Sequence, residues 1–206
     1  ELIADTETPI SSLIKISANE KYSFLLESVE GGDQRGRYSL LGCDPDIIWE
    51  VKNNKAFIKN LNKNLDLSFL SSEPIESLRE LIKFLKIERS IEEPPFPVLV
   101  GYFGYPMIQN MENIKLQNPD EINIPDAIMI KPKLVAVFDN IKDTINIMTS
   151  VYPNEKIKAE SAFHITSDYI NGAIKKLNSE IVLKTKSNNQ KDINFQSNYT
   201  KKEYFE

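Results

Sequence analysis

The chain has 206 residues, of which 41% are hydrophobic and 27% are charged, and its formal net charge at pH 7 is −5. These proportions are typical of a globular protein and argue against a chain that is disordered throughout. An acidic chain lacks the basic face that binds phosphate backbones, so we expect no nucleic-acid partner. No apolar run is long enough to cross a bilayer, and the N-terminal stretch ELIADTETPI lacks the features of a signal peptide. We therefore expect no membrane partner and a cytoplasmic location.

Cysteine and histidine are each used once. Cys43 cannot form an internal disulfide, and His164 lies far from it in sequence. Two such residues are a poor set of zinc ligands, or of nucleophile and base, so we predict no metal site and no catalytic residues from them. Cys43 is instead predicted to be a small packed apolar residue.

The first predicted helix begins at Thr8-Pro9 and ends near Ile16, because a threonine cap followed by proline is a common helix start. A strand follows from Tyr22 to Val29, and its alternation divides the side chains between two faces. One face carries Phe24, Leu26 and Ser28, and the other carries Leu25, Glu27 and Val29. Gly31-Gly32 then ends this strand, and a second apolar run begins at Tyr38.

The stretch from Tyr22 to Gly42 is the one on which functional inference depends, because each face of the first strand carries a polar group. An unpaired buried polar group costs about 1–3 kcal/mol, so these groups need partners. One interpretation is a plain hairpin in which Glu27 pairs with Arg37, and spacing alone favours it. The other is a small polar pocket for a zwitterionic or amphipathic molecule, lined by Glu27, Ser28 and the return from Arg37 to Ser39.

The middle of the chain contains a turn, a hairpin and a helix. Asp44-Pro45-Asp46 is predicted to be a turn, and a hairpin is predicted around Asn53-Asn54. Residues 60–69 are predicted to be an irregular segment or a hairpin. From Pro74 the apolar residues recur at three- and four-residue spacing, which predicts a surface helix that covers a sheet. Glu92 to Pro97 is predicted to be an extended linker.

The run VLVGYFGY is predicted to be a strand that is covered on both faces. Gly101 and Gly104 in this run indicate either close approach of another segment or ligand, or a bulge. Three further strands are predicted at residues 127–132, 133–139 and 144–152, the last two as a hairpin. A long helix is predicted to begin just after Pro153 and to continue to about Leu177.

The C-terminal part indicates a boundary. Residues 184–194 are polar and low in complexity, which is typical of a linker or an exposed loop. Thr200 and Glu203 have the spacing of a capping box, and the chain ends before the second turn of that helix. We therefore interpret the chain as an N-terminal piece of a longer protein.

Several segments resemble the N-terminal region of anthranilate synthase component I, the large subunit of that enzyme. They are LLESVEGG followed by GRYSLLGCDPD, Thr8-Pro9, GYFGY at residues 101–105, IPDAIMIKPKLVAVFDN at residues 124–140 and SNYTKKEYFE at the end. The resemblance covers most of the chain from about Thr8 to Asn140 and is faint between Asn53 and Pro94. The pairing of LLES with GRYS is its most specific part.

The resemblance implies an α+β fold in which antiparallel β-sheets pack orthogonally with flanking helices. It implies that the full-length protein converts chorismate and ammonia from glutamine to anthranilate and pyruvate, a carbon–oxygen lyase reaction of tryptophan biosynthesis. Chorismate, Mg²⁺ and the catalytic residues would belong to the C-terminal half, and a glutamine amidotransferase subunit, component II, would be the partner. Residues 1–183 would be the regulatory region, and residues 184–206 a linker and the start of the catalytic domain. Alone, the chain would be inactive.

In the family that this sequence resembles, the LLES strand lines the site where L-tryptophan binds as feedback inhibitor. The resemblance therefore implies an effector site at Leu26, Glu27, Ser28, Tyr38 and Ser39. One departure is Pro106, because the family usually has an aspartate after GYFGY. Two alternatives remain open, namely the corresponding region of aminodeoxychorismate synthase component I and a free-standing small-molecule binding module.

Overall fold

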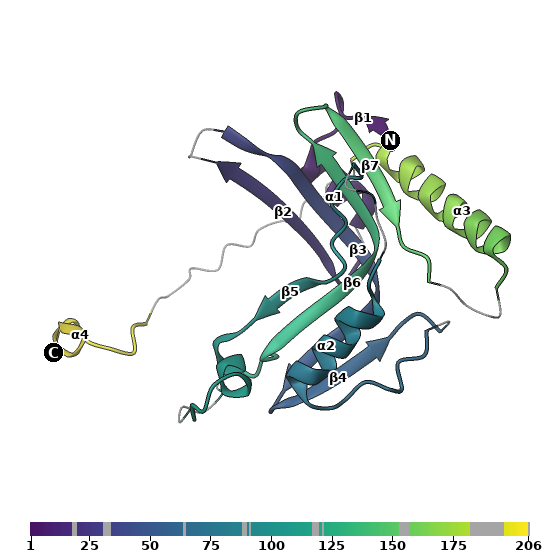
Figure 1. Cartoon of the computed structure of the whole chain (residues 1–206). Coiled ribbons are helices and arrows are strands. Elements are labelled where there is room, and N and C mark those ends of the chain that lie inside the picture. Colours follow the sequence, from purple (N-terminus) through teal and green to yellow (C-terminus); the bar gives the residue numbers. More distant parts are fainter. Residues whose placement is uncertain are drawn as a thin grey trace.

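The computed structural model describes residues 1–17, 20–30, 34–63, 65–87, 90, 92–116, 120, 122–152, 157–181 and 196–205, with the side chains of all of these except residues 28–30, 34 and 35. Its strands form one seven-stranded antiparallel sheet with helices on either side, which confirms the predicted α+β class with antiparallel strands and flanking helices (Figure 1). The strands are β1 (Leu2–Ile3), β2 (Ser23–Glu30), β3 (Gln34–Lys52), β4 (Lys55–Asn60), β5 (Val100–Phe103), β6 (Ala127–Asp139) and β7 (Thr144–Thr149). The helices are α1 (Pro9–Ser17), α2 (Pro74–Phe84), the 3-10 helix η1 (Tyr105–Asn110), α3 (Ala159–Leu177) and α4 (Lys201–Phe205).

The long strands β3 and β6 form the spine of the sheet. One arm has the order β1-β7-β6-β3-β2, and in the other arm β4 joins β3 and β5 joins β6. Helices α1 and α3 lie against the first arm, and α2 lies over the second (Figure 1). The described strands thus join in one bent sheet with a separate apolar core in each arm.

The two cores lie on opposite faces of the sheet. The first joins α1 and α3 to Leu134 and Ala136 of β6, whereas the second joins α2 to Ala127 and Met129 of the same strand. Because side chains alternate along a strand, even-numbered and odd-numbered residues of β6 point in opposite directions. Helices α1 and α3 therefore cover one face of the sheet in the first arm, and α2 covers the opposite face in the second arm.

A bulge in β3 makes this change of face possible. The prediction of a turn at residues 44–46 is wrong, because β3 continues as a strand through this segment. Pro45 pairs with Pro132 and Ile47 pairs with Lys131, so Asp46 is an extra residue on β3, and Asp44 before it has φ of 50°. One inserted residue shifts the alternation by one and bends the strand.

The same pairing corrects a second prediction. Residues 127–139 form one strand, β6, and not two, although Pro132 lies in the middle of it. Proline cannot donate to a sheet ladder and is usually confined to edges or bulges. Since Pro132 faces Pro45, the two missing donors fall at a single place in the ladder, beside the bulge.

Three local predictions are confirmed. Helix α1 begins at Pro9, and Thr8 Oγ1 accepts a hydrogen bond from the backbone N–H of Ser11 at 3.1 Å. The hairpin of β3 and β4 turns at Asn53 and Asn54, which have φ of 51° and 59°. Helix α2 begins at Pro74.

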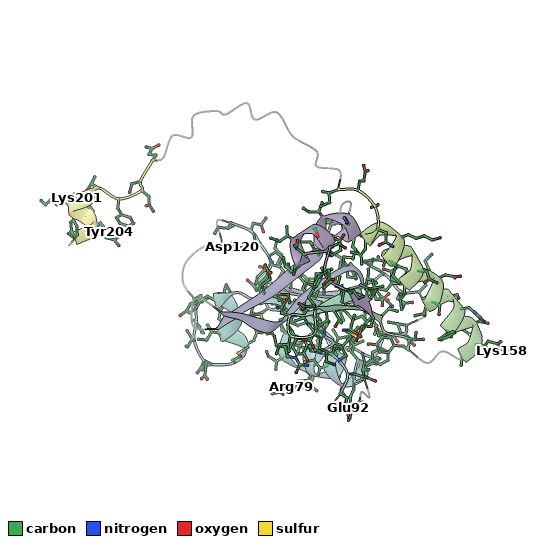
Figure 2. The ribbon with its side chains drawn as sticks, turned by 90° about the horizontal axis from the view of Figure 1, so that it is seen from above. Arg79, Glu92, Asp120, Lys158, Lys201 and Tyr204 are labelled. Carbon is green, nitrogen blue, oxygen red and sulfur yellow. The ribbon has the colours of Figure 1, made fainter. Side chains whose placement is uncertain are left out.

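The long helix α3 begins later than predicted. It starts at Ala159 with Lys158 in an extended conformation before it, and the predicted start at residues 154–155 lies outside the described residues. Figure 2 shows Lys158 at the outer end of this helix, and only its last turns bury Ala173 and Leu177.

Strand β5 is more exposed than predicted. Its sequence predicts a strand that is covered on both faces, but Gly101, Tyr102 and Phe103 are exposed. Gly101 does lie at a close approach, because a Cβ atom at this position would be 1.8 Å from the carbonyl oxygen of Ile128. This favours close backbone approach as the reason for the glycine.

The C-terminal helix α4 is short and set apart from the sheet. Figure 2 shows Lys201 and Tyr204 far from the other elements, and none of the helix is buried. Its capping box is confirmed, since Thr200 and Glu203 exchange hydrogen bonds of 2.8 and 3.3 Å through their backbone N–H groups. The predicted linker at residues 184–194 lies outside the described residues. Within the described ranges, no helix has both the length and the apolar character to span a membrane.

Candidate functional site

Strands β2 and β3 bring the two parts of the candidate site side by side. Leu26 pairs with Leu40, and Glu27 pairs with Ser39. The regular register is interrupted between Glu27 and Val29, so Ser28 lies at an irregularity in the strand. The side chain of Ser28 is outside the described part of the chain, and its role stays a prediction.

The candidate residues divide between the two faces of this hairpin. Cross-strand partners share a face, so Glu27 and Ser39 lie on the side of α1 and α3. Ser39 is only 4% exposed, whereas Glu27 is open to solvent. Leu26 is 47% exposed and lies on the opposite face, to which alternation also assigns Tyr38. The hairpin therefore offers a carboxylate and a hydroxyl on one face and apolar groups on the other.

Arg37 does not pair with Glu27, so that part of the plain hairpin interpretation is wrong. Its Nη2 atom donates to Asp139 Oδ2 at 2.9 Å, and its Nε atom lies 3.3 Å from both carboxylate oxygens. The Arg37 hydrogen bonds hold the pKa of Asp139 below its ordinary value, against the opposing effect of burial. The partner of Arg37 could not be predicted from nearby sequence, since it lies on β6.

Two polar clusters were missed by reasoning from sequence. Asp46 and Lys131 form a buried ion pair at the bulge, and the Lys131 ammonium lies 4.9 Å from the centroid of the Tyr152 ring. Asp44 accepts a 2.6 Å hydrogen bond from the hydroxyl of Tyr169 on α3. The signal for the first cluster was Lys131 itself, a charge that directly follows the apolar run of residues 127–130. Both clusters hold structural elements together.

Cys43 behaves as a packed apolar residue, as predicted. It is 2% exposed and belongs to the core between the sheet and α1 and α3. Burial raises the pKa of its thiol to about 12, so the thiolate that reactive cysteines need is disfavoured. His164 is exposed on α3.

Metal-binding clusters and concave regions could mark a second functional site within the described residues. Across those ranges, no three side chains of His, Cys, Asp or Glu come together as ligands for a metal ion. A concave region of about 480 Å³ lies between the start of α2 and η1, and it is lined by residues 73–76, Arg79, Asn110 and Met111. Arg79 lies at the surface there (Figure 2). This region is in the second arm, away from the β2–β3 hairpin.

Curated proteins named anthranilate synthase component 1 match most of the chain. The protein from Cereibacter sphaeroides is 34% identical over 179 residues, which cover 85% of this chain and 36% of the relative. The protein from Synechocystis is 28% identical over 218 residues, which cover all of this chain and 42% of the relative. The chain thus spans well under half the length of these relatives. No protein-family model matches it.

A solved structure resembles the fold. Anthranilate synthase component I from Streptococcus pneumoniae TIGR4 superposes with a TM-score of 0.51 and 20% sequence identity, over 87% of this chain and 37% of that chain. At this identity the likeness supports the arrangement of strands and helices. The relatives and the structural neighbour carry the same name.

Proposed function

Since the chain belongs to the anthranilate synthase component 1 family, we propose that it is the N-terminal regulatory region of such an enzyme and that its β2–β3 hairpin lines a feedback site for L-tryptophan. The whole enzyme would convert chorismate and ammonia to anthranilate and pyruvate, with ammonia delivered by a glutamine amidotransferase subunit. Chorismate, Mg²⁺ and the acid–base groups would belong to the part of the relatives that this chain does not span.

The observation that carries the proposal is the pairing of the LLES and GRYS segments. They lie on neighbouring strands, with Glu27 directly opposite Ser39 and Leu26 directly opposite Leu40. Tryptophan has an ammonium, a carboxylate and an indole ring. An exposed carboxylate, that of Glu27, matches the ammonium, and the half-exposed Leu26 matches the ring. The division of these groups between two faces means that tryptophan would bind around the edge strand β2.

The test is inhibition of anthranilate formation by tryptophan in the full-length enzyme. Ser28→Phe should abolish inhibition and leave turnover near normal, because a bulky side chain at the strand irregularity fills the space for the ligand. Ser39→Ala should weaken inhibition less, since it removes one hydrogen-bond partner without filling space. Ser68→Phe is the matched control, because Ser68 is exposed in a loop of the second arm, and it should stay as sensitive as the wild type.

Two outcomes would count against the proposal. If Ser28→Phe remains fully sensitive to tryptophan, the effector site is elsewhere. If Ser28→Phe loses its response only because it loses activity, Ser28 has a structural role and the plain hairpin interpretation is right.

A further inference from the structure

The guanidinium of Arg37 is fixed on one side and open on the other. A guanidinium has two edges that can each bind a carboxylate through two N–H groups. Asp139 occupies the edge formed by Nε and Nη2, with Nη2 2.9 Å from Oδ2. The edge formed by Nη1 and the second proton of Nη2 has no partner among the described residues, and the side chain is 46% exposed.

Asp139 is itself held rigidly, so it can orient Arg37. It is 4% exposed, and its Oδ1 accepts hydrogen bonds from the backbone N–H groups of Ile141 and Lys142 at 3.1 and 3.2 Å. The next residue, Asn140, donates from its backbone to the carbonyl of Arg37 and from its side chain to the carbonyl of Gly36, each at 2.8 Å. The β6–β7 turn therefore fixes both the backbone and the side chain of Arg37.

Aromatic and apolar groups lie beside this oriented cation. The guanidinium carbon is 4.8 Å from the centroid of the Tyr38 ring. Leu26 and Leu40 pair across the strands on the face that Tyr38 shares, and Leu26 is half exposed. A fixed cationic edge next to an apolar surface fits a ligand with a carboxylate and an aromatic ring.

We propose that Arg37 binds the α-carboxylate of the effector and that Asp139 is the positioning residue that orients it. This inference rests on the proposed function, because it assigns a contact within the same effector site. The sequence interpretation put the return from Arg37 to Ser39 in the lining of the pocket, but it gave Arg37 no ligand contact and Asp139 no role. The arrangement makes the β6–β7 turn part of the site, although the turn follows β2 by about a hundred residues in the chain.

The experiment compares L-tryptophan with L-tryptophanamide, which keeps the ammonium and the indole but replaces the carboxylate by a neutral amide. Binding of both to the full-length protein is measured by calorimetry. Arg37→Gln should weaken tryptophan binding by about ten- to a hundredfold and leave binding of the amide nearly unchanged, because it removes a charge-assisted contact. Asp139→Asn keeps a side-chain oxygen that can accept the hydrogen bonds from the β6–β7 turn, but it removes the charge that orients Arg37. It should therefore also reduce the preference for tryptophan over the amide.

Controls separate this role from a structural one. Lys59→Gln removes an exposed cation from β4 in the other arm, and it should leave the preference unchanged. A variant that merely loosens the hairpin should weaken the binding of both ligands to the same extent. Arg37→Lys should recover part of the preference for tryptophan over the amide, because it keeps the positive charge. If Arg37→Gln prefers tryptophan over the amide as strongly as the wild type does, the proposal for Arg37 fails. If the wild type does not bind tryptophan at all, it is the proposed function that fails.

Discussion

Replacing Asp46 by asparagine should destabilise the fold strongly, because it leaves a buried cation without its counter-charge. Lys131 is fully buried, and its ammonium contacts the carboxylate of Asp46, the extra residue of the β3 bulge. Removal of one partner from a buried ion pair typically costs about 3–5 kcal/mol. With a urea dependence of about 1–3 kcal/mol per molar, the unfolding midpoint should fall by about 1–5 M.

The pH dependence gives a second signature. Burial lowers the pKa of Lys131 below its ordinary value of 10.5, while the hydrogen bond that Lys131 donates to Asp46 raises the pKa and so opposes that change. Without the Asp46 charge the folded pKa should fall further. The unfolded chain then binds more protons than the folded one between that lowered pKa and 10.5, so stability rises with pH in this window. The loss of unfolding free energy caused by Asp46→Asn should therefore become smaller as pH increases toward 10.5.

Urea unfolding followed by circular dichroism tests this reasoning. The double variant Asp46→Asn with Lys131→Met is the control, because it removes the unpaired buried ammonium and methionine fills a volume similar to that of the lysine side chain. It should recover most of the lost stability. A single variant as stable as the wild type, or a deficit that does not change with pH, would refute the view that Lys131 stays charged because of Asp46.

Gly101→Ala should lower the unfolding midpoint, because its Cβ would lie 1.8 Å from the carbonyl oxygen of Ile128 and overpacking typically costs about 1–3 kcal/mol. Gly172→Ala, whose Cβ would meet nothing within 4 Å on α3, should be neutral or stabilising, and equal effects would contradict this explanation. The purified chain should form no anthranilate from chorismate with ammonia or glutamine, and fluorescence of the product above background would contradict this expectation. The chain should bind a hydrophobic dye through the exposed aromatic residues Tyr102 and Phe103 of β5, and the absence of dye fluorescence would indicate that this surface is covered in solution.

Elements with strong local signals were predictable from sequence. The cap at Thr8, the asparagine turn at residues 53–54 and the capping box at Thr200 each depend on residues that are neighbours along the chain. Such motifs satisfy backbone groups locally, so they need little information about the rest of the fold.

Features that depend on distant partners were not predictable. Asp44-Pro45-Asp46 has turn residues, but pairing with β6 keeps the segment in a strand. Pro132 interrupts a strand pattern in sequence, yet its pairing with Pro45 allows β6 to continue. In the candidate site, the sequence predicted that the segments around Glu27 and Ser39 meet, but the partner of Arg37 lies about a hundred residues away on β6. Long-range pairing decided each of these cases.

Hydrogen exchange of the backbone amides in the full-length enzyme, with and without L-tryptophan, tests most directly whether this hairpin binds the effector. Binding should slow exchange in β2 and in residues 36–42 of β3, because the ligand would order the edge of the sheet. Strand β4 lies in the other arm, so its exchange should not change. Slowed exchange elsewhere in an inhibited enzyme, with β2 and β3 unchanged, would contradict the proposal.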